Sequence, residues 1–594
     1  MFPNLKEHEY FVLDTETTGL TYPVDRVFGV SIALPHEETF YWDIRRTPSL
    51  FEWLNDSMRR YKGKIVAHHA KFDWLMCRCS GIKLPESRLI DTMTTAVLID
   101  EHLYEYSLDA LCIFYELGQK KTLPSKARMQ DLPFDQVSEY ARHDALLTLK
   151  LHKWQQEEIE RQGLHDIVNF EHTILPTICR ANARGIRVDL DRAEKAITEL
   201  TPIIENKKLE LNQLVGKEVN VNSGPQIKKI FEPQLVNDEW VANDGTTLGT
   251  TDKGGPSIGS EYLMKMKHPA APLILEVRSL LKTQGTFLEK HILGHEVGGR
   301  VYPTINQNKG EDGGTGTGRL SYVNPAMQQI PSRNEKVAAI VKSCFLPEEG
   351  CKWVDSDQAS FEVRVFIHLV NNQKMIEAYH KNPELDGHQF VADLTGLPRK
   401  ASYSGQPNAK QLNLSMIFNS GNGAIAEEMG MPWTWDQFMD PHGQIIRYRK
   451  ASNEAMAVIN HYHENMPGVK ELASRAKETA KERGHVKTFT GRRLRFPDKR
   501  YCYKASGLLI QATAADINKR TWLHIEQALE GDGCLTLNTH DSYGMSIKES
   551  VLMDRAKKVK YTVETNNVLR VPVILEVSPP GDNWWDSANG ERML

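Results

Sequence analysis

The hydrophobic pattern of this chain changes its period along the sequence, and that change limits the folds open to it. Residues 10–43 hold three short runs rich in β-branched and aromatic residues, with Gly and Pro between them, as expected for strands. Residues 136–161 instead space their apolar side chains as a helix does. Residues 165–300 are mostly helical in pattern, and strands and helices mix again beyond residue 350. A chain of 594 residues with such blocks is too long for one hydrophobic core, so we expect roughly three or four domains.

Composition excludes several classes of protein. The chain is 40% hydrophobic and 25% charged, which is typical of a soluble globular protein. It has no run of 18 apolar residues and no basic then apolar leader, so neither a membrane span nor a secretory signal is expected. The eight cysteines are scattered and form no CxxC pair, so structural zinc and a disulfide framework are not expected, and a reducing cytoplasm fits.

The charge distribution is more informative than the net charge of −4. Residues 470–504 carry twelve Lys or Arg side chains against four Asp or Glu. Within them, "GHVKTFTGRRLRFPDKR" sets basic residues among aromatic and turn residues, which suits a surface that meets phosphates. A solvated helix face explains the same charges, so both interpretations stay open here.

Carboxylates recur in the first 160 residues. "VLDTETTGL" places Asp14 and Glu16 two apart at the end of an apolar strand, so both point to one face. Two such acids are either a solvated strand end or ligands of a divalent metal, which prefers oxygen donors. Asp73 follows a second strand, and Tyr140 and Asp144 lie four apart on one helix face. Four acids from separate elements suit two metals that activate water against a phosphodiester.

The ordered pattern DxE, FD and YxxxD over residues 1–160 resembles the DEDD family of 3′→5′ exonucleases, in its tyrosine-containing variety. The resemblance implies an RNase H-like domain in which the four acids hold two metals and Tyr140 orients the attacking water. His69 stands where the family often has Asn. It either supports the metal site indirectly or packs, and we expect packing.

The segment "CKWVDSDQASFEVRVFIHL" is similar to a metal-binding motif of family A DNA polymerases. In that family a metal-binding Asp is followed five residues later by Glu and then, two further on, by Arg. Asp357, Glu362 and Arg364 match this spacing, whereas Ser360 lies five past Asp355. The register therefore selects Asp357, and Asp355 is expected to be a strand-end acid.

Further segments resemble family A polymerases in the family's own order, including "TGRLSYVNPAMQQIPSR", "PNAKQLNLSMIF" and "QATAADINKR". In "LNTHDSYGMSI" an Asp is by default a turn residue, but the resemblance makes Asp541 a metal ligand on a hairpin that faces Asp357. Lys410 becomes the candidate proton donor to pyrophosphate. The resemblance also implies DNA contacts from Arg319, Gln511, His540, Arg492 and Arg493, and nucleotide contacts from Glu362, His388, Lys410, Leu414 and Phe418.

The resemblance implies a multidomain α/β and α+β fold, with an RNase H-like exonuclease domain and a right-hand polymerase. The expected domains are the exonuclease (1–160), a helical linker and thumb (161–314), the first part of the palm (315–375), the fingers (376–500), and the second part of the palm with the C-terminus (501–594). A layout without a 5′-nuclease domain is typical of phage replicases, so we expect a phage enzyme that works in the host-cell cytoplasm.

Four positions depart from the family. Gln406 stands where Arg is usual, Leu414 replaces an aromatic residue, Phe418 replaces Tyr, and Ser542 replaces the Glu of His-Asp-Glu. The first removes a positive charge from the triphosphate site, which Arg399 or Lys400 would have to replace. Weaker nucleotide binding or altered sugar discrimination is expected.

The sequence therefore predicts a template-directed DNA polymerase that adds dNMPs to a primer 3′-hydroxyl and proofreads. Two Mg²⁺ ions are expected at each site, with Mn²⁺ as a substitute. The expected partners are primer-template DNA and dNTPs, with helicase-primase, single-strand binding protein or a processivity factor as further candidates and no membrane. The alternative is a 3′→5′ exonuclease with a degenerate, DNA-gripping polymerase half. The intact acids argue against a DNA-binding factor in which both sites are inactive. Glu362 and the exonuclease motifs argue against an RNA polymerase.

Overall fold

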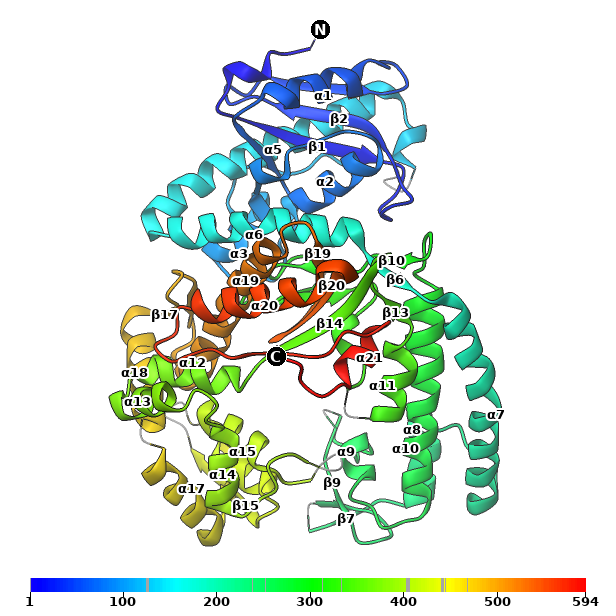
Figure 1. Cartoon of the computed structure of the whole chain (residues 1–594), viewed down its shortest axis with the longest axis vertical. Helices are drawn as coiled ribbons and strands as arrows, with labels where there is room; N and C mark the ends of the chain where they lie inside the picture. Colours follow the sequence, from blue (N-terminus) through cyan, green and yellow to red (C-terminus); the bar gives the residue numbers. More distant parts are fainter. Residues whose placement is uncertain are drawn as a thin grey trace.

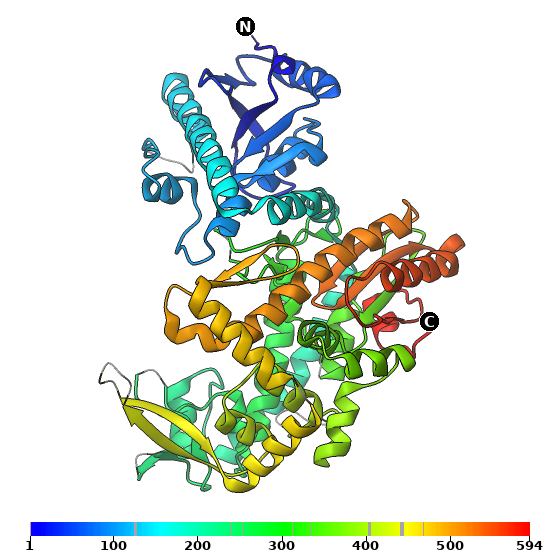
Figure 2. The ribbon, with the colours of Figure 1, turned by 90° about the vertical axis from the view of Figure 1, so that its left-hand side faces the viewer.

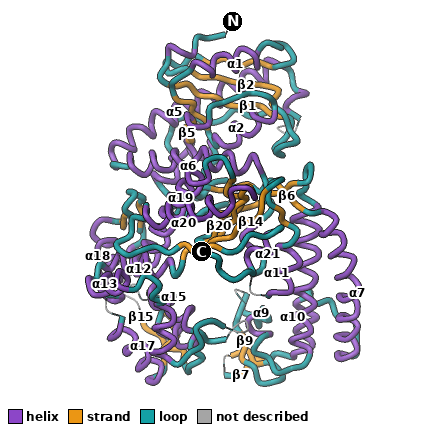
Figure 3. The backbone as a smooth tube through the Cα atoms, in the orientation of Figure 1, coloured by secondary structure: helices purple, strands orange, loops and turns teal. Residues whose placement is uncertain are grey.

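The computed structural model describes residues 2–123, 128–237, 239–251, 253–311, 313–332, 334–401, 406–439, 443, 445–466 and 468–594. The N-terminal domain lies at one end of an elongated molecule, and the C-terminus lies near the middle (Figure 1). Strands gather in the N-terminal domain and at the centre, and helices make up most of the rest (Figure 3). Within the described part of the chain, no helix is long and apolar enough to cross a lipid bilayer.

The N-terminal domain is built on one five-stranded sheet of order β3-β2-β1-β4-β5, in which β1 pairs antiparallel with β2 and parallel with β4. Val12 on β1 packs against Ala145 and Leu149 of α5, whereas its neighbours Phe11 and Leu13 pack on the opposite face with α1 and α2. Since side chains alternate along a strand, the face of Val12 is also the face of the acids that follow it. The elements are β1 Tyr10–Thr17, β2 Val27–Ala33, β3 Thr39–Asp43, α1 Leu50–Arg60, β4 Lys64–Ala67, α2 Ala70–Cys79, β5 Leu89–Asp91, α3 Thr92–Ile99, α4 Leu108–Phe114 and α5 Phe134–Gln162.

A mostly helical region follows, and it extends away from the sheet as two long neighbouring helices, α7 and α10 (Figure 1). Its far end has an apolar core of its own. There Lys265 forms an ion pair of 3.6 Å with Glu427, so the tip of this region contacts the lobe on the other side. The elements are α6 His165–Arg184, β6 Ile186–Val188, α7 Leu190–Val215, α8 Gly224–Phe231, β7 Gln234–Val236, β8 Glu239–Val241, β9 Thr247–Leu248, α9 Ser260–Leu263, α10 Ala270–Leu281, a π-helical stretch Lys282–Leu293, β10 Arg300–Val301 and β11 Thr304–Asn306.

An antiparallel sheet of order β19-β20-β14-β21 forms the centre of the molecule. Its apolar side chains join those of α19 and α20 in the largest core of the described chain. The elements are β12 Ser321–Val323, α11 Glu335–Lys342, β13 Phe345–Leu346, β14 Cys351–Gln358, α12 Phe361–Val370, α19 Ala505–Leu529, β19 Gly533–Thr539, β20 Ser542–Lys548, α20 Leu552–Thr565, β21 Leu575–Val577 and α21 Trp584–Ala588.

The lobe between α12 and α19 is helical and carries a protruding two-stranded hairpin, β15–β16, drawn in yellow in Figure 2. Its helix α15 begins at Ala409 with Asn408 as its cap, so Pro407 precedes the helix and does not open it. The elements are α13 Gln373–Lys381, α14 Gly387–Thr395, α15 Ala409–Ile417, α16 Asn422–Glu428, β15 Trp433–Met439, β16 Ile445–Ala451, α17 Asn453–Asn465, α18 Val469–Arg483, β17 His485–Lys487 and β18 Arg493–Arg495.

Candidate active sites

The first candidate site lies where the carboxyl half of β1 meets α5. Asp14 and Glu16 follow Val12 on the sheet face that α5 covers, and Tyr140 and Asp144 lie on α5 itself. Asp73, in the first turn of α2, accepts hydrogen bonds from the backbone N–H and hydroxyl of Thr15 at 3.1 and 2.7 Å. The fold therefore brings together all four predicted acids and the predicted tyrosine.

These carboxyl groups lie close together and repel one another strongly. Burial, then the negative charge of Asp144, raises the pKa of Asp14 to about 7. Burial, then Asp14, also raises the pKa values of Glu16 and of Asp73 well above their ordinary range. Such a cluster is unfavourable unless positive charge is added to it.

One cation of the protein already lies in the cluster. Lys120 Nζ forms an ion pair of 2.6 Å with Asp144 Oδ2, and it lies 5.6 Å from the ring centroid of Tyr140. The other carboxylate oxygen, Asp144 Oδ1, is buried without a hydrogen-bond partner among the described residues. A buried, unpaired oxygen beside three further acids is a donor set that fits a hard divalent cation. No three His, Cys, Asp or Glu side chains of the described ranges stand in metal-ligand geometry as they are.

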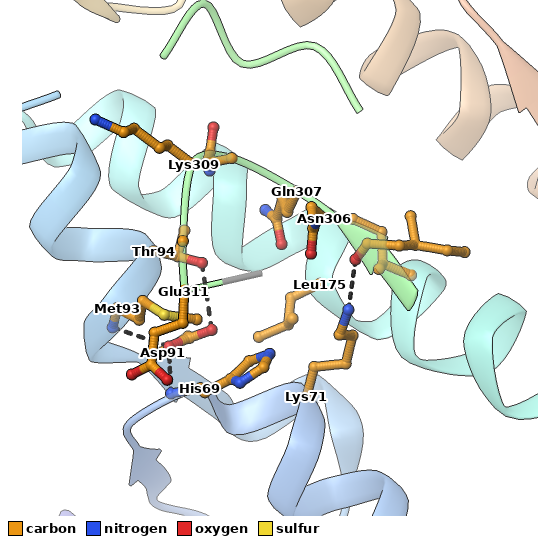
Figure 4. Close-up of a pocket in the computed structure, with 14 residues that line it drawn as sticks. His69, Lys71, Asp91, Met93, Thr94, Leu175, Asn306, Gln307, Lys309 and Glu311 are labelled. Atoms are coloured by element: carbon orange, nitrogen blue, oxygen red, sulfur yellow. Dashed lines mark hydrogen bonds between the residues drawn. The ribbon is translucent and has the colours of Figure 1, made fainter. Parts of the chain in front are cut away.

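His69 lies outside this cluster, at the junction with the polymerase half. It lines a cavity of about 30 Å³ beside Asp91 and Leu175, beneath residues 305–311 (Figure 4). Its backbone N–H donates to Asp91 Oδ1 at 3.1 Å. On the same wall Lys71 Nζ donates to the carbonyl oxygen of Ile305 at 2.5 Å. His69 therefore contributes to the contact between the two halves of the chain.

The second candidate site lies on the central sheet. Asp357 is the last residue but one of β14 and lies opposite Ser542 of β20, and the N–H of Gln358 donates to the carbonyl oxygen of Asp541 at 3.0 Å. Burial, then the charge of Asp541, raises the pKa of Asp357 well above its ordinary range. Burial also raises the pKa of Asp541, against an opposing effect of Lys410. Two neighbouring acids again form a donor set that fits a divalent cation.

A small cavity of about 30 Å³ lies beside these acids. Arg319, Glu362, His540 and Asp541 line it, and Arg319 donates to Glu362 Oε1 at 2.6 Å. Burial raises the pKa of Glu362, and the guanidinium of Arg319 opposes that rise. Arg319, a predicted DNA contact, and Glu362, a predicted nucleotide contact, thus hold each other in place.

The helix α15 carries Lys410, whose charge opposes the rise in the pKa values of Asp357 and Asp541. His388 lies behind it and is only 4% exposed. Burial, then Lys410, lowers the pKa of His388 to about 4, so its imidazole is neutral and offers a hydrogen bond instead of a charge. Arg399, a suggested substitute for the missing arginine at Gln406, donates to Asp386 Oδ2 at 2.5 Å.

Arg492 was predicted to contact DNA, but its guanidinium does not reach the protein surface. It is 2% exposed, pairs with Glu171 and donates from Nε to Asp516 Oδ1 at 2.9 Å. Lys519 completes the cluster at 2.7 Å from Glu171. Burial acts to raise the pKa of Glu171, but the two cations outweigh burial and hold it at about 2. The cluster joins α6 to the polymerase half. The local basic motif around Arg492 gives no sign of this structural role, because the partners of Arg492 are distant in sequence.

Comparison with known proteins decides the family. The sequence profile of DNA polymerase family A matches residues 190–586, which is most of the chain. The chain belongs to DNA polymerase family A. The profile of a 3′-5′ exonuclease matches residues 1–160, so this polymerase carries an exonuclease domain as well. These matches confirm the family and the enzyme class that the motifs predicted.

Phage polymerases are among the relatives of this family A enzyme. The DNA polymerase DpoZ of Vibrio phage phiVC8 is 49% identical, over 98% of this chain and 96% of the relative. The DpoZ of Salmonella phage PMBT28 is 43% identical, over 99% and 98%. The fold is similar to the POL domain of Pol1 from M. smegmatis, solved with DNA primer-template and dNTP, with a TM-score of 0.79 at 20% identity over 98% and 97% of the two chains.

Sequence reasoning missed four residues at these sites. Lys120 pairs with Asp144, and Glu576 of β21 lies opposite Asp357 on the strand edge away from Ser542. The amide of Asn413 contacts His388 Nδ1 at 3.1 Å and accepts from the hydroxyl of Tyr462 at 2.8 Å. Only Asn413 carried a local signal, because it lies three residues after Lys410 on α15.

Proposed function

We propose that Asp357 and Asp541 form the polymerase centre and that Asp14, Glu16, Asp73 and Asp144 form the proofreading centre. One observation carries the first assignment. Two acids 184 positions apart in sequence meet where β14 passes the turn between β19 and β20, and the charge of Lys410 acts on both. Placing two carboxylates side by side costs free energy unless a cation balances their negative charge.

Asp357 and Asp541 would hold two divalent cations, with Mg²⁺ as the natural choice for oxygen ligands and Mn²⁺ as a substitute. When bound, these ions supply the positive charge that stabilises the attacking and leaving oxygens of nucleotidyl transfer. The four acids of the N-terminal domain would hold a second pair for phosphodiester hydrolysis.

The remaining residues bind and position the substrates. Lys410 neutralises the triphosphate and donates a proton to the departing pyrophosphate. Neutral His388 donates a hydrogen bond to a phosphate oxygen, in a tautomer set by Asn413. Glu362, fixed by Arg319, occupies the space of a ribose 2′-hydroxyl and so selects deoxyribonucleotides. Leu414 and Phe418 line the same face of α15, and Gln511, His540 and Arg319 contact the primer-template.

In the N-terminal domain, Tyr140 orients the attacking water through its hydroxyl, one helical turn from Asp144. The domain assignment follows the same boundaries as the sequence: exonuclease 1–160, helical linker and thumb 161–314, palm 315–375 and 501–594, and fingers 376–500. The likeness to phage polymerases supports a replicative role in an infected cell, in its cytoplasm, on primer-template DNA with dNTPs and with replication proteins as partners.

Two alanine variants test both centres at once. Asp357→Ala should lower primer extension by about a thousandfold or more, because its carboxylate is essential to charge stabilisation, and leave release of nucleotides from single-stranded DNA within about twofold. Asp14→Ala should do the reverse. Extension that survives Asp357→Ala would overturn the polymerase assignment. Absence of extension in the unmodified enzyme would favour an exonuclease whose polymerase half only grips DNA.

A further inference from the structure

One face of α19 borders the cavity beside Asp541, and it carries a polar side chain that neither proposed centre uses. Ala514, Ala515 and Asn518 line that cavity. The two alanines are buried, whereas Asn518 is half-buried. Because residues three, four and seven apart share a helix face, Gln511 lies on this face as well. The face therefore has an amide at each end and two small side chains between them.

The rotation of α19 about its axis is fixed from another face. Asp516 accepts from Arg492 Nε at 2.9 Å, and Lys519 Nζ lies 2.7 Å from Glu171, so both residues belong to the buried ionic cluster. The helix also contacts β19 of the central sheet and α20 (Figure 1). These contacts hold the remaining face of α19, and with it Asn518, toward the cavity.

Three hydrogen bonds set the direction of the Asn518 amide. Its Oδ1 accepts from the hydroxyl of Tyr543 at 2.9 Å and from Gln358 Nε2 at 3.1 Å. The second N–H of Gln358 Nε2 donates to the Tyr543 hydroxyl at 2.5 Å, so the side-chain donors of Gln358 and Tyr543 are all used. Burial raises the pKa of Tyr543, so its hydroxyl keeps the proton that it donates.

The opposite orientation of the two amides is less favourable. Gln358 is 1% exposed, and its Oε1 has no hydrogen-bond partner among the described residues. If both amides turned over, the two N–H groups of Gln358 would take that place and stay unpaired, which costs more than one unpaired carbonyl oxygen. Asn518 thus keeps Oδ1 inward and directs Nδ2 to the cavity, where it has no acceptor in the described part of the chain.

The position of this donor limits the ligand that suits it. Asp541 lines the same cavity and is one of the acids proposed to act at the primer 3′-hydroxyl, so the nucleotide at the primer end lies nearest. Purine N3 and pyrimidine O2 are the acceptors that the bases present in the minor groove. Gln511 lies seven residues earlier, or about 10 Å along the helix axis, which is about three stacked base pairs.

We propose that Asn518 is a specificity-determining residue of nucleotide addition, which donates from Nδ2 to the minor-groove acceptor of the terminal primer base. Ala514 and Ala515 leave room for the edge of that base beside α19, while Tyr543 keeps the amide turned toward it. A mismatched primer end moves the acceptor out of line and loses the hydrogen bond. This inference rests on the proposed polymerase centre and adds a residue to it.

A primer that ends in 3-deazaguanine tests the hydrogen bond from the DNA side, because carbon replaces the N3 acceptor and the pairing edge is unchanged. All proteins carry Asp14→Ala, so that hydrolysis does not remove the primer end. Without further change, kcat/KM for the next nucleotide should be about fivefold lower on this primer than on a guanine-ended primer. Asn518→Leu should lose about the same factor on the guanine primer and nothing more on the 3-deazaguanine primer.

Two outcomes of this experiment contradict the proposal. A residue that only supports the fold would lower kcat/KM on both primers equally when Asn518 is replaced by Leu. An enzyme with Asn518 intact that extends both primers equally well would show that no donor reaches N3.

Tyr543→Phe tests whether the amide is held in place, because it removes a donor to Asn518 Oδ1 and leaves the amide itself. The preference for guanine over 3-deazaguanine should fall from about fivefold to about twofold. Tyr561→Phe, which removes an exposed hydroxyl on α20, should leave the preference unchanged. An unchanged preference in Tyr543→Phe would show that the hydrogen bonds around Asn518 do not orient it.

Mismatched primers give a second readout, and a binding measurement separates this inference from the polymerase centre. Asn518→Leu should lower the ratio of kcat/KM for matched over mismatched ends by about fivefold, since the mismatched end lacks the bond already. An unchanged ratio would count against the proposal. If the enzyme extends no primer, the polymerase centre is refuted. Fluorescence anisotropy in Ca²⁺ would still show whether primer-template ending in guanine binds more tightly than its 3-deazaguanine counterpart, and whether Asn518→Leu removes the difference.

Discussion

The two acidic centres of this polymerase are assembled in opposite ways. The exonuclease cluster takes four acids from one compact domain and includes a lysine, Lys120, in the same domain. The palm centre has two acids, Asp357 on β14 and Asp541 in the turn before β20, and its lysine, Lys410, comes from the separate helical lobe. The first centre is therefore complete within a single core, whereas the second depends on how a neighbouring lobe is placed.

This difference matters for the order of events at each site. A phosphodiester can enter a cluster whose charges are already arranged. At the palm, the positive charge on the triphosphate side depends on α15 lying over the sheet. We therefore expect nucleotide binding and lobe position to be linked at the polymerase centre, in a way that the exonuclease centre does not need.

The largest expected effect is a difference in primer extension between variants of the two lysines, Lys410 and Lys120. Lys410→Met should lower the rate of primer extension by about a hundredfold, because proton donation and triphosphate neutralisation are lost together. Hydrolysis of single-stranded DNA should stay within about twofold. Rapid-quench measurement of single-nucleotide addition reports the first rate. Lys120→Met is the matched control, since it should leave extension unchanged, and an equal loss of extension in both variants would contradict the comparison.

A smaller effect is expected on the stability of the metal-free protein. The folded-state pKa of Asp14 is raised from 3.8 to about 7, so the folded protein binds this proton more tightly than the unfolded chain does. Stability from this group is therefore greatest at low pH and is lost as the pH rises through 7. In EDTA the melting temperature should fall by several degrees between pH 5 and 7 and level off above pH 7, and Mg²⁺ should restore it.

Asp14→Asn should flatten this pH dependence, because an amide does not ionise. Asp357→Asn should flatten it less, because the Asp357 side chain is exposed and solvent screens its repulsion by neighbouring acids. Differential scanning fluorimetry on the full chain measures both variants. Equal slopes of melting temperature against pH in the two variants would show that the electrostatic repulsion is the same in both acidic clusters.

The smallest effect tests the missing third acid of the palm. Ser542→Ala should change extension by less than about twofold, because a serine hydroxyl offers little charge stabilisation at Asp357. Glu576→Gln removes an acid that lies opposite Asp357 on the other neighbouring strand and should lower extension several-fold more. Both effects are read as kcat for primer extension at saturating dNTP. A larger loss in Ser542→Ala would overturn this ranking.

The sequence by itself predicted the family and the two enzyme activities, which the comparisons confirm, and it supplied the acids proposed for both centres, because catalytic acids recur at fixed spacings within local strands and helices. It did not determine contacts across the fold. Arg492 lies in a basic motif typical of DNA contacts, yet tertiary structure buries it between Glu171 and Asp516. Lys120 and Glu576 were not identified for the same reason, since the contact of each depends on elements distant in sequence. Local spacing encodes chemistry that stays within one element, whereas burial and charge pairing are decided only when separate elements pack.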